Sequence, residues 1–400
     1  INPFRVVSAL DAAGEKGRSV TYAKGFSNEN DSMTEQELEK ALRTAAEADV
    51  AVIFAGLPEI FESEGYDRTS MKLPKCQDRL IEEVLKVQPN VVVVLHNGSP
   101  VELPWADRVS AILEMYLGGQ GVGEACDRLL FGEANPSGRL AETFPYRLED
   151  NPSFLHFPGN GKRVLYGEDI FVGYRYYDTK KVPVRYAFGH GLSYTEFTYG
   201  DLTLSSAQMT DEDILTVSLK VKNSGKTEGK EVVQLYVADL CGISERPVKE
   251  LKGFAKVHLL PGEEKTVSME ISARNLSYYE ERLGDWYAPS GTYRILIGHA
   301  SDDIRLHADV VFETKKKLPL RVDFTTTFGE LLDHTKTAPV ITELLAPLAA
   351  AAASAEGMSD EYKKLGEQVI REMPLKSLLG QMPGEQVEQL IGQLNCLLAQ

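Results

Sequence analysis

Two runs of apolar residues constrain the fold of this chain more than any other feature of its sequence. They read DVAVIFAG at 49–56 and NVVVVLHNG at 90–98, and both are rich in β-branched side chains. A continuous apolar run of this length is typical of a strand in a parallel sheet that is covered on both faces. We therefore expect the two runs to be buried strands of one such sheet.

Helical patterns alternate with these runs. Thr34 and Glu37 have the spacing of a capping box, which marks the first turn of a helix. We expect helices over about 34–48, 76–87 and 121–132, and further strands over 21–26 and 111–117. Because strands and helices that alternate are typical of a parallel sheet, residues 1–150 are predicted to form an α/β domain. This domain is expected to be a three-layer α/β sandwich with a mostly parallel sheet.

The next two regions have different patterns. Residues 151–212 are rich in Tyr, Gly and Pro, and we interpret them as an ordered connector whose aromatic side chains dock onto neighbouring domains. Over 213–314, apolar and polar residues alternate in short segments between turn residues, which predicts a β-sandwich of roughly seven strands. Since no Cys–Trp–Cys spacing is present, a fibronectin type III-like sandwich is favoured over an immunoglobulin domain.

The tail, residues 315–400, has mainly helical patterns. An amphipathic helix is expected near 331–348, broken at Pro339 and Pro347. The alanine-rich stretch 347–357 fits either a helix or a linker. Further helices are expected over 361–373 and 384–398. Both a helical hairpin that packs on a missing partner and an independent domain agree with these patterns.

The composition argues against several classes of partner. The chain carries 43 basic and 59 acidic residues, a formal net charge of −16, whereas nucleic-acid binding needs a cationic surface. Its longest apolar runs, such as VVVVL at 91–95, are far too short to span a bilayer. We therefore expect no nucleic acid and no membrane among its partners, and a neutral substrate suits this charge balance. A homo-oligomer is left open.

The cysteines and glycines give no sign of a metal or a cofactor. Cys76, Cys126, Cys241 and Cys396 lack metal-ligand spacing and a dense disulfide framework, so we expect buried free thiols. Their sparseness favours a cytoplasmic location, with secretion as the alternative. LGGQGVGEA (117–125) departs from the dinucleotide motif G-x-G-x-x-G because a Glu replaces the last Gly. Close strand–helix packing accounts for these glycines, and neither a cofactor nor a metal is expected.

An acidic loop follows the first of the two buried strands. FESEGYDR (61–68) places three acids beside Phe61 and Tyr66. Ligands of parallel sheets bind at the carboxyl ends of the strands, and HNGSP (96–100) is predicted at the same edge. A carboxylic acid next to an aromatic surface keeps its proton to a higher pH, as a general acid must. A solvated acidic turn is the alternative that this pattern alone leaves open.

Three other side chains have simpler interpretations. His96, at the end of the second strand, fits a hydrogen-bonded turn residue better than a substrate ligand. Trp105, after a proline, fits a core anchor better than a platform for a sugar. Trp286 in GDWYAPSG fits a turn of the sandwich.

Five motifs follow one another along the chain. They read FESEGYDRTSMKLPKCQDRLIEEV, VVVVLHNGSPVELPW, YLGGQGVGEACDRLLFGEANPSGRLAETFP, VGYRYYD and YAFGHGLSYTEF. Together they resemble glycoside hydrolase family 3, and most closely its β-glucosidases. The resemblance covers about residues 1–315 and implies the domain order of the family, with an α/β sandwich, a connector and a fibronectin type III-like domain.

The resemblance implies a retaining mechanism with two carboxylates. The family uses a nucleophilic aspartate from a (β/α)8 barrel and an acid/base glutamate from the α/β sandwich domain. In the β-glucosidases this glutamate lies in a segment S/G-E-G-Y-D-R, which matches Glu64 in this chain. Glu64 is therefore the expected acid/base, and Glu62 is the second choice because such loops vary in length.

The remaining side chains of the loop are expected to support this acid. Asp67 and Arg68 are expected to pair and to brace the loop around the site. Phe61 and Tyr66 are expected to line the place where the leaving group departs, although packing would explain them equally well.

The predicted activity is the release of terminal non-reducing β-D-glucosyl residues from β-glucosides or oligosaccharides. No barrel pattern is found in these 400 residues, and the chain begins INPFRVV without Met, so we interpret it as a fragment or as one part of a split enzyme. The barrel is expected on another chain or on a missing part of the same precursor, and this chain alone should be inactive. The alternatives are a β-xylosidase or another β-glycosidase of the family, and a non-catalytic carbohydrate-binding or scaffolding module.

Overall fold

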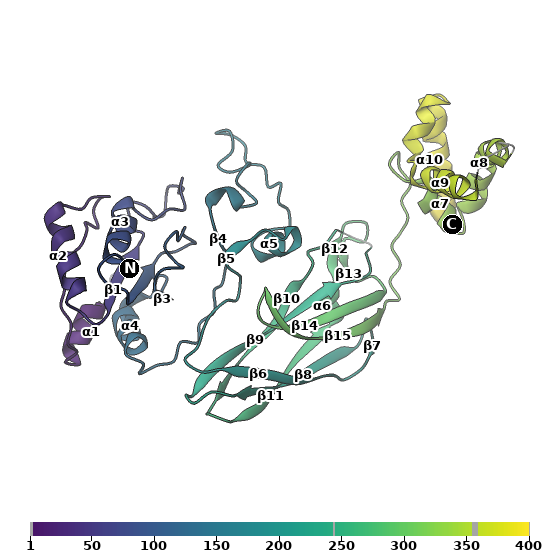
Figure 1. Cartoon of the computed structure of the whole chain (residues 1–400). Coiled ribbons are helices and arrows are strands. Elements are labelled where there is room, and N and C mark those ends of the chain that lie inside the picture. Colours follow the sequence, from purple (N-terminus) through teal and green to yellow (C-terminus); the bar gives the residue numbers. More distant parts are fainter. Residues whose placement is uncertain (1–2, 243–244, 354–358, 400) are drawn as a thin grey trace. The chain divides into compact units, whose positions relative to one another are not determined.

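The computed structural model describes residues 3–242, 245–353 and 359–399 (Figure 1). The chain divides into two compact units. The first comprises Ile1–Ser277 and Ala288–Thr314, and the second comprises Tyr278–Tyr287 and Lys315–Gln400.

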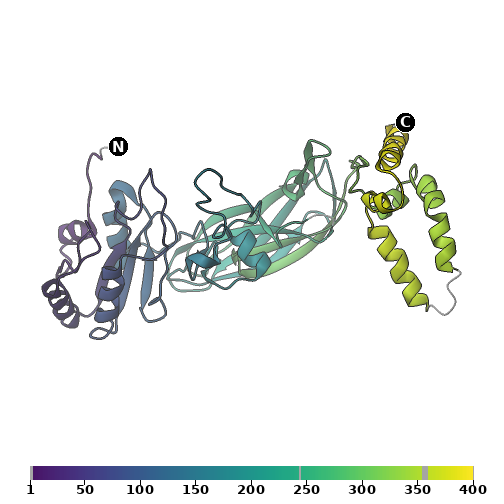
Figure 2. The same cartoon turned by 90° about the horizontal axis from the view of Figure 1, so that it is seen from above.

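The first unit begins with a three-stranded parallel sheet in the order β1-β2-β3. The strands are β1 (Ala51–Gly56), β2 (Val91–His96) and β3 (Ala111–Glu114). Ala51 lies opposite Val91, and Val92 lies opposite Ala111. The helices of this domain are α1 (Ala9–Glu15), α2 (Glu35–Ala46), α3 (Lys75–Val84) and α4 (Val122–Leu130). Figures 1 and 2 show α2 and α3 beside the strands, and the predicted parallel α/β domain is confirmed.

Local sequence signals set the starts of the helices. The hydroxyl of Thr34 accepts a hydrogen bond from the backbone N–H of Glu37 at 3.2 Å, and the Glu37 carboxylate accepts one from the backbone N–H of Thr34 at 2.9 Å. The capping box predicted at α2 is therefore present. Ser8 and Asp11 form a second capping box at α1, a helix that was not among those predicted.

Two strand predictions were wrong. Residues 21–26 form no strand, because no described strand runs beside them and a strand needs the hydrogen bonds of a neighbour. β1 is not covered on both faces, since Val52 and Phe54 remain 38% and 40% exposed. β1 lies at an edge of the sheet, where fewer elements cover its side chains.

The core of the α/β domain lies where α2 and α3 meet the sheet, with Ile53, Leu80 and Val93 among its buried side chains. Trp105 belongs to this core and is 0% exposed. Its indole N–H donates a hydrogen bond to the carboxylate of Asp78 at 2.8 Å. Trp105 is therefore a core anchor, as expected.

A connector follows the α/β domain. It contains β4 (Phe144–Pro145), a 3-10 helix (Leu148–Asp150), α5 (Tyr174–Lys180) and β5 (Val184–Tyr186), and β4 pairs with β5. Tyr174 stacks on Phe188 with ring centroids 4.7 Å apart and meets Tyr236 of β9 (Gly229–Asp239) edge-on at 5.9 Å. At this contact, the expected docking of connector aromatics onto a neighbouring domain is confirmed.

The β-sandwich consists of a five-stranded sheet, β10-β9-β14-β15-β7, and a three-stranded sheet, β11-β8-β6. The other strands are β6 (Phe197–Leu204), β7 (Gln208–Thr210), β8 (Ile214–Asn223), β10 (Glu250–Leu259), β11 (Glu264–Ser272), β14 (Gly291–Ala300) and β15 (Asp303–Glu313), and α6 (Ala273–Leu276) follows β11. Side chains of both sheets form one core, in which Val217 and Ile295 are each 0% exposed.

The sandwich begins earlier than the predicted boundary at residue 213. β6 pairs with β8 and β7 pairs with β15, although the sequence pattern predicts that both segments lie in the connector. The pairing of β6 is irregular between Gly200 and Thr203, and Asp201 there has φ +50. This irregularity interrupts the period-two alternation that identifies a strand from sequence.

The second unit has a core of its own. It contains a hairpin of β12 (Tyr278–Glu280) and β13 (Asp285–Tyr287), then α7 (Phe328–Asp333), α8 (Ala338–Ala353), α9 (Asp360–Glu372), a 3-10 helix (Leu375–Gly380) and α10 (Gly384–Ala399). Leu331, Ile341 and Leu394 are each 0% exposed in this core. The core favours an independent domain, and the two helices predicted nearest the C-terminus are confirmed.

Three expectations for this unit need correction. Pro339 lies in the first turn of α8, where its missing N–H costs no helical hydrogen bond, and Pro347 lies inside the same helix. Neither proline breaks the helix. Residues 347–353 are helical, whereas 354–357 lie outside the described residues. Trp286 lies in strand β13 and not in a turn of the sandwich.

Candidate active site

The strands β1 and β2 end together at one edge of the sheet, with Gly56 opposite His96. A Cβ atom at Gly56 would lie 2.0 Å from the carbonyl oxygen of His96, so only glycine fits there. From α3, the buried side chain of Gln77 donates to the carbonyl oxygen of Gly56 at 2.9 Å and accepts from its N–H at 2.8 Å. These contacts fix the point at which the FESEGYDR loop leaves the sheet.

Glu62 joins this loop to the loop after β2. Its Oε2 atom accepts a hydrogen bond from the backbone N–H of Gly98 at 2.5 Å, and its Oε1 atom accepts one from the hydroxyl of Ser99 at 2.6 Å. Arg68 lies 3.4 Å from Oε1 of Glu62 and donates to the Ser99 hydroxyl oxygen at 2.5 Å. The two segments that the sequence placed at one edge of the sheet are therefore in direct contact.

The expected pair of Asp67 and Arg68 is absent. Arg68 contacts Glu62 and also donates to the carbonyl oxygen of Pro100 at 3.4 Å. Asp67 is exposed, and no ion pair joins it to another residue in the described part of the chain. Arg68 thus reaches the carboxylate six positions before it and not the adjacent one.

Glu64 differs from Glu62 in its environment. It is exposed, and no hydrogen bond or ion pair joins it to any residue that the structure describes. Gly65 follows it with φ +101, a conformation that residues with a side chain rarely adopt. Of the three acids in this loop, Glu62 is therefore held in place, whereas Glu64 and Asp67 are exposed without an ion pair among the described residues.

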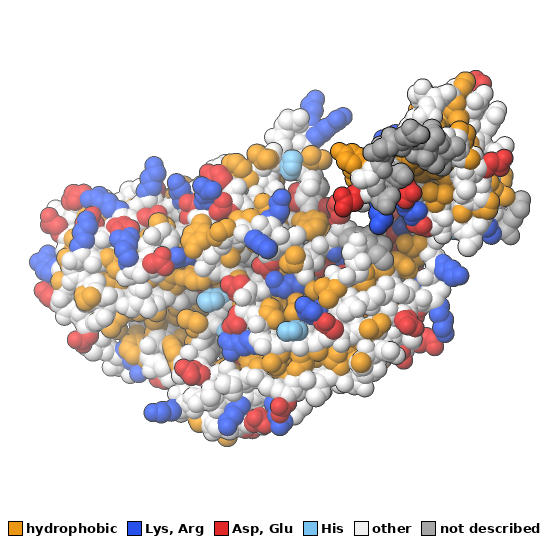
Figure 3. Space-filling view, turned by 45° about the vertical axis from the view of Figure 1, so that its right-hand side comes forward, with side chains coloured by type: hydrophobic (Ala, Val, Ile, Leu, Met, Phe, Trp, Pro, Cys, Tyr) orange, Lys and Arg blue, Asp and Glu red, His pale blue; other side chains and the backbone are white. Residues whose placement is uncertain are grey.

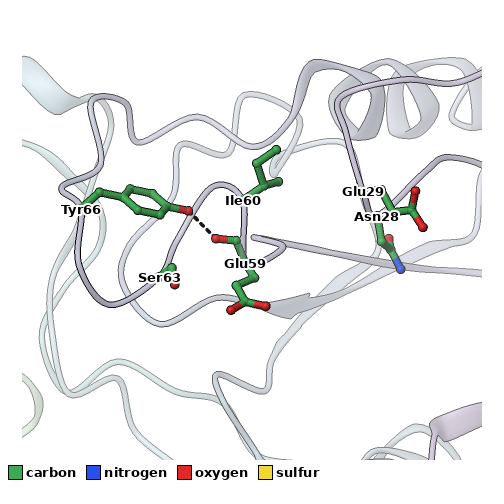
Figure 4. A pocket seen from close by; sticks show the side chains of 6 residues that line it. All are labelled: Asn28, Glu29, Glu59, Ile60, Ser63 and Tyr66. Atoms are coloured by element: carbon green, nitrogen blue, oxygen red, sulfur yellow. Dashed lines mark hydrogen bonds between the residues drawn. The ribbon is translucent and has the colours of Figure 1, made fainter.

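An open hollow of about 580 Å³ borders the loop (Figure 4). It is lined by Asn28, Glu29, Glu59, Ile60, Ser63 and Tyr66. The hydroxyl of Tyr66 donates to the carbonyl oxygen of Glu59, and the side chain is 49% exposed. Phe61 is half-buried. One aromatic side chain of the loop thus borders a hollow, and the assignment of both to a leaving-group site stays a prediction.

Two acids near this edge were not identified from the sequence. Burial raises the pKa of Glu114, the last residue of β3, to about 7, although a hydrogen bond from the N–H of Tyr116 at 2.8 Å opposes the shift. Burial also raises the pKa of Glu142, and the negative charge of Glu62 adds to this shift. A glutamate inside the apolar run AILEMYL was the signal that could have identified Glu114.

His96 is a hydrogen-bonded residue at the end of β2, in agreement with its simpler interpretation. Its Nδ1 atom lies 3.3 Å from the carbonyl oxygen of Tyr116, and its ring stacks on Phe54 with centroids 6.2 Å apart. Burial lowers its pKa, although the contact with Tyr116 opposes the shift. The ring is therefore held in its neutral form near pH 7.

The glycines of LGGQGVGEA have a different role from the expected one. A Cβ atom at Gly123 would lie 2.2 Å from the carbonyl oxygen of Val7, close to the start of α1. Neither Gly119 nor Gly121 has a neighbouring atom within 4 Å of such a Cβ. Only Gly123 among these three is required by packing, and the contact joins α4 to α1 and not a helix to a strand.

The described residues contain no group of three or more His, Cys, Asp or Glu side chains that could hold a metal ion. Within the same residues, no helix is long and apolar enough to cross a membrane. The four cysteines are free, as expected, but only Cys76 and Cys126 are buried, while Cys241 is half-buried and Cys396 is exposed.

Comparison with known protein families matches two domains. Residues 2–194 match the glycosyl hydrolase family 3 C-terminal domain, and residues 231–301 match a fibronectin type III-like domain. The second match agrees with the type of sandwich that the sequence predicted.

Similar proteins match most or all of the chain. Thermostable beta-glucosidase B of Acetivibrio thermocellus is 45% identical over 99% of this chain and 53% of its own length. An exo-alpha-(1->6)-L-arabinopyranosidase of Bifidobacterium breve is 37% identical over 100% of this chain and 51% of its own length. The crystal structure of a Bifidobacterium adolescentis GH3 beta-glucosidase is 38% identical, with a TM-score of 0.79 over 85% of this chain and 50% of that one. The chain thus spans about half the length of these proteins.

Proposed function

Since the chain belongs to glycosyl hydrolase family 3, we propose that it is the part of a retaining β-glucosidase that supplies the general acid/base, Glu64. The enzyme would release terminal non-reducing β-D-glucosyl residues from β-glucosides. The observation that carries this proposal is the contrast within FESEGYDR, where Glu62 is held by hydrogen bonds and Glu64 is exposed without a partner among the described residues.

In the proposed mechanism, Glu64 acts twice. It first donates its proton to the glycosidic oxygen while a carboxylate from the rest of the enzyme attacks the anomeric carbon and forms a covalent glycosyl-enzyme. The Glu64 carboxylate then takes a proton from water, which attacks the same carbon and releases the sugar with retained configuration. A retaining enzyme holds its two carboxyl groups about 5 to 5.5 Å apart. This chain would supply one of them.

The second carboxylate is proposed to come from a (β/α)8 barrel on another chain or on another part of the same precursor. The described residues form a three-stranded parallel sheet, a sandwich and a helical unit, and none of them belongs to such a barrel. In the connector, Leu155, Leu165 and Tyr166 are 86%, 62% and 82% exposed, and hydrophobic side chains are visible at the surface in Figure 3. Exposed apolar surface of this kind supports docking of a further domain. The chain alone is expected to be inactive.

The acid/base role is tested by Glu64→Ala in the enzyme assembled from this chain and its barrel portion. A missing general acid slows the cleavage of poor leaving groups far more than that of activated aryl glucosides, so the loss should be largest on cellobiose. Added azide should restore part of the rate on the aryl substrate, because this anion needs no general base. Glu39→Gln, an acid-to-amide change at an exposed position of α2 outside the candidate site, is the control. Equal losses on both substrates, without rescue by azide, would refute the assignment.

A different substrate specificity within the same family is the second candidate. The arabinopyranosidase matches the whole chain with 37% identity, so the sequence of this part does not separate the two activities. Rates on aryl β-D-glucoside, β-D-xyloside and α-L-arabinopyranoside would distinguish a β-glucosidase from a β-xylosidase and an arabinopyranosidase. Carbohydrate binding by the chain without any barrel would favour a non-catalytic module instead.

A further inference from the structure

The loop that carries Glu64 has no regular secondary structure to hold it. Residues 57–74 form turns and irregular backbone between β1 and α3. A general acid must lie within about 2.6 to 3.2 Å of the oxygen that it protonates, and a displacement of about 1 Å can cost 10²-fold in rate. An exposed acid on such a loop therefore needs an anchor close to it in the chain.

We propose that Glu62 is this anchor, a positioning residue that holds the loop so that Glu64 keeps its place. The inference rests on the proposed role of Glu64. The carboxylate of Glu62 receives hydrogen bonds from Gly98 at 2.5 Å and Ser99 at 2.6 Å, and both donors lie on the loop after β2. Hydrogen bonds to an ionised carboxylate are roughly twice as strong as those between neutral groups.

The anchor acts at short range. The backbone N–H of Glu62 donates to the carbonyl oxygen of Pro58 at 3.2 Å, so both the main chain and the side chain of this residue are held. Two peptide units place Glu64 at most about 7 Å farther along the chain, measured between Cα atoms. A movement of Glu62 would therefore be transmitted to Glu64 with little attenuation.

The partner loop is shaped around this carboxylate. A Cβ atom at Gly98 would lie 3.0 Å from Oε2 and 3.2 Å from Oε1 of Glu62, so alanine at this position would displace the carboxylate. Ser99 donates its hydroxyl proton to Glu62 and accepts a hydrogen bond from Arg68 at 2.5 Å. Arg68 thus orients the Ser99 hydroxyl. Ser99 is the donor and Glu62 the acceptor of the hydrogen bond between them.

The kinetic test uses Glu62→Ala, Glu64→Ala and the double variant in the assembled enzyme. Glu62→Ala should lower kcat for cellobiose about 10- to 100-fold with KM little changed, because the substrate still binds while the acid is misplaced. The double variant should be no slower than Glu64→Ala, since an anchor has no effect once the acid is gone. Glu62→Gln should recover part of the rate, because its amide oxygen can accept one of the two hydrogen bonds. Losses that multiply in the double variant would overturn the proposal.

Rescue by azide distinguishes the role of Glu62 from that of Glu64. It should restore rate in Glu64→Ala and not in Glu62→Ala, which retains its acid/base. Rescue of Glu62→Ala to the same extent would overturn the proposal and make Glu62 the acid/base itself. Glu39→Gln, at an exposed position of α2 outside the candidate site, is again the control.

Hydrogen exchange at the Gly98 amide tests the anchor without any activity. In the chain itself, Glu62→Ala and Glu62→Gln should accelerate this exchange, by about tenfold or more for alanine, while Glu64→Ala leaves it unchanged. Unchanged exchange in Glu62→Ala would overturn the anchor, whatever the role of Glu64. Faster exchange together with a fully active Glu64→Ala enzyme would instead overturn the proposed function and reduce Glu62 to a structural contact. Ser99→Ala, which removes one donor only, provides a second variant if Glu62→Ala does not fold.

Discussion

The carboxylate of Glu231 lies 2.6 Å from the Nδ1 atom of His299, and no part of the Glu231 side chain reaches solvent. Arg139 lies 2.7 Å from the same carboxylate, and the hydroxyl of Tyr199 donates to it at 2.6 Å. The Nε2 atom of His299 lies 2.9 Å from the carbonyl oxygen of Gly191. This network joins three strands of the sandwich to the segments that lead into it from the α/β domain.

Glu231→Ala should destabilise the chain by about 3 to 5 kcal/mol, because it leaves Arg139 buried without a carboxylate. The free energy of unfolding in urea at pH 7 measures this change. Glu228→Ala, at a carboxylate that is 65% exposed and 3.5 Å from His258, is the control and should cost less than about 1 kcal/mol. Similar losses in the two variants would contradict this role of the buried network.

The contribution of Glu231 to the stability of the fold should decrease at low pH. Burial raises its pKa, but the hydrogen bond from His299 and the charge of Arg139 outweigh burial and hold the pKa below the ordinary value of 4.5. A carboxylate with a lowered folded-state pKa stabilises the fold above about pH 4.5, and this stabilisation is lost as the pH falls through the lowered value. The stability difference between the unmodified chain and Glu231→Gln should therefore shrink below pH 4.5. A difference that stays constant from pH 7 to pH 3 would contradict it.

Trp105 should report the ionisation of Asp78. Burial raises the pKa of Asp78 to about 6, and the hydrogen bond from Trp105 opposes this shift. The chain has 2 tryptophans, so Trp286→Phe leaves Trp105 as the single emitter. In that variant the indole fluorescence should titrate with a midpoint near pH 6, and the further change Asp78→Asn should abolish the transition. A midpoint near pH 4 would mean that burial does not control this carboxyl.

The features that the sequence predicted best are those set by residues close together in the chain. The capping box of Thr34 and Glu37 spans three positions, and the apolar runs of β1 and β2 need no distant partner to be recognised. The parallel sheet followed from these signals. β6 was missed because its irregular pairing near Asp201 hides the alternation that marks a strand.

The contacts of the candidate site depend on residues far apart in the chain, and the sequence predicted them less well. Sequence reasoning paired Arg68 with its neighbour Asp67, whereas the structure gives it Glu62, which in turn accepts from Ser99, 37 positions away. The raised pKa of Glu114 has the same origin, because it comes from burial that only the folded chain creates. A motif identified the loop and its likeness to a family, but not the partners of its side chains.

Alanine should destabilise the fold at position 123, unlike alanine two positions before it. A Cβ atom at Gly123 would lie 2.2 Å from the carbonyl oxygen of Val7 and 2.4 Å from the carbonyl carbon of Ser8, and neither backbone atom can move without moving α1. Gly123→Ala should therefore cost about 1 to 3 kcal/mol in the free energy of unfolding, a typical cost of overpacking, even though alanine favours a helix. Gly121→Ala, in the same segment, meets no atom within 4 Å and should change stability by less than about 1 kcal/mol. Thermal or urea unfolding of the two variants side by side measures the difference. Equal stability of both would show that α1 does not pack against α4 as closely as the structure has it.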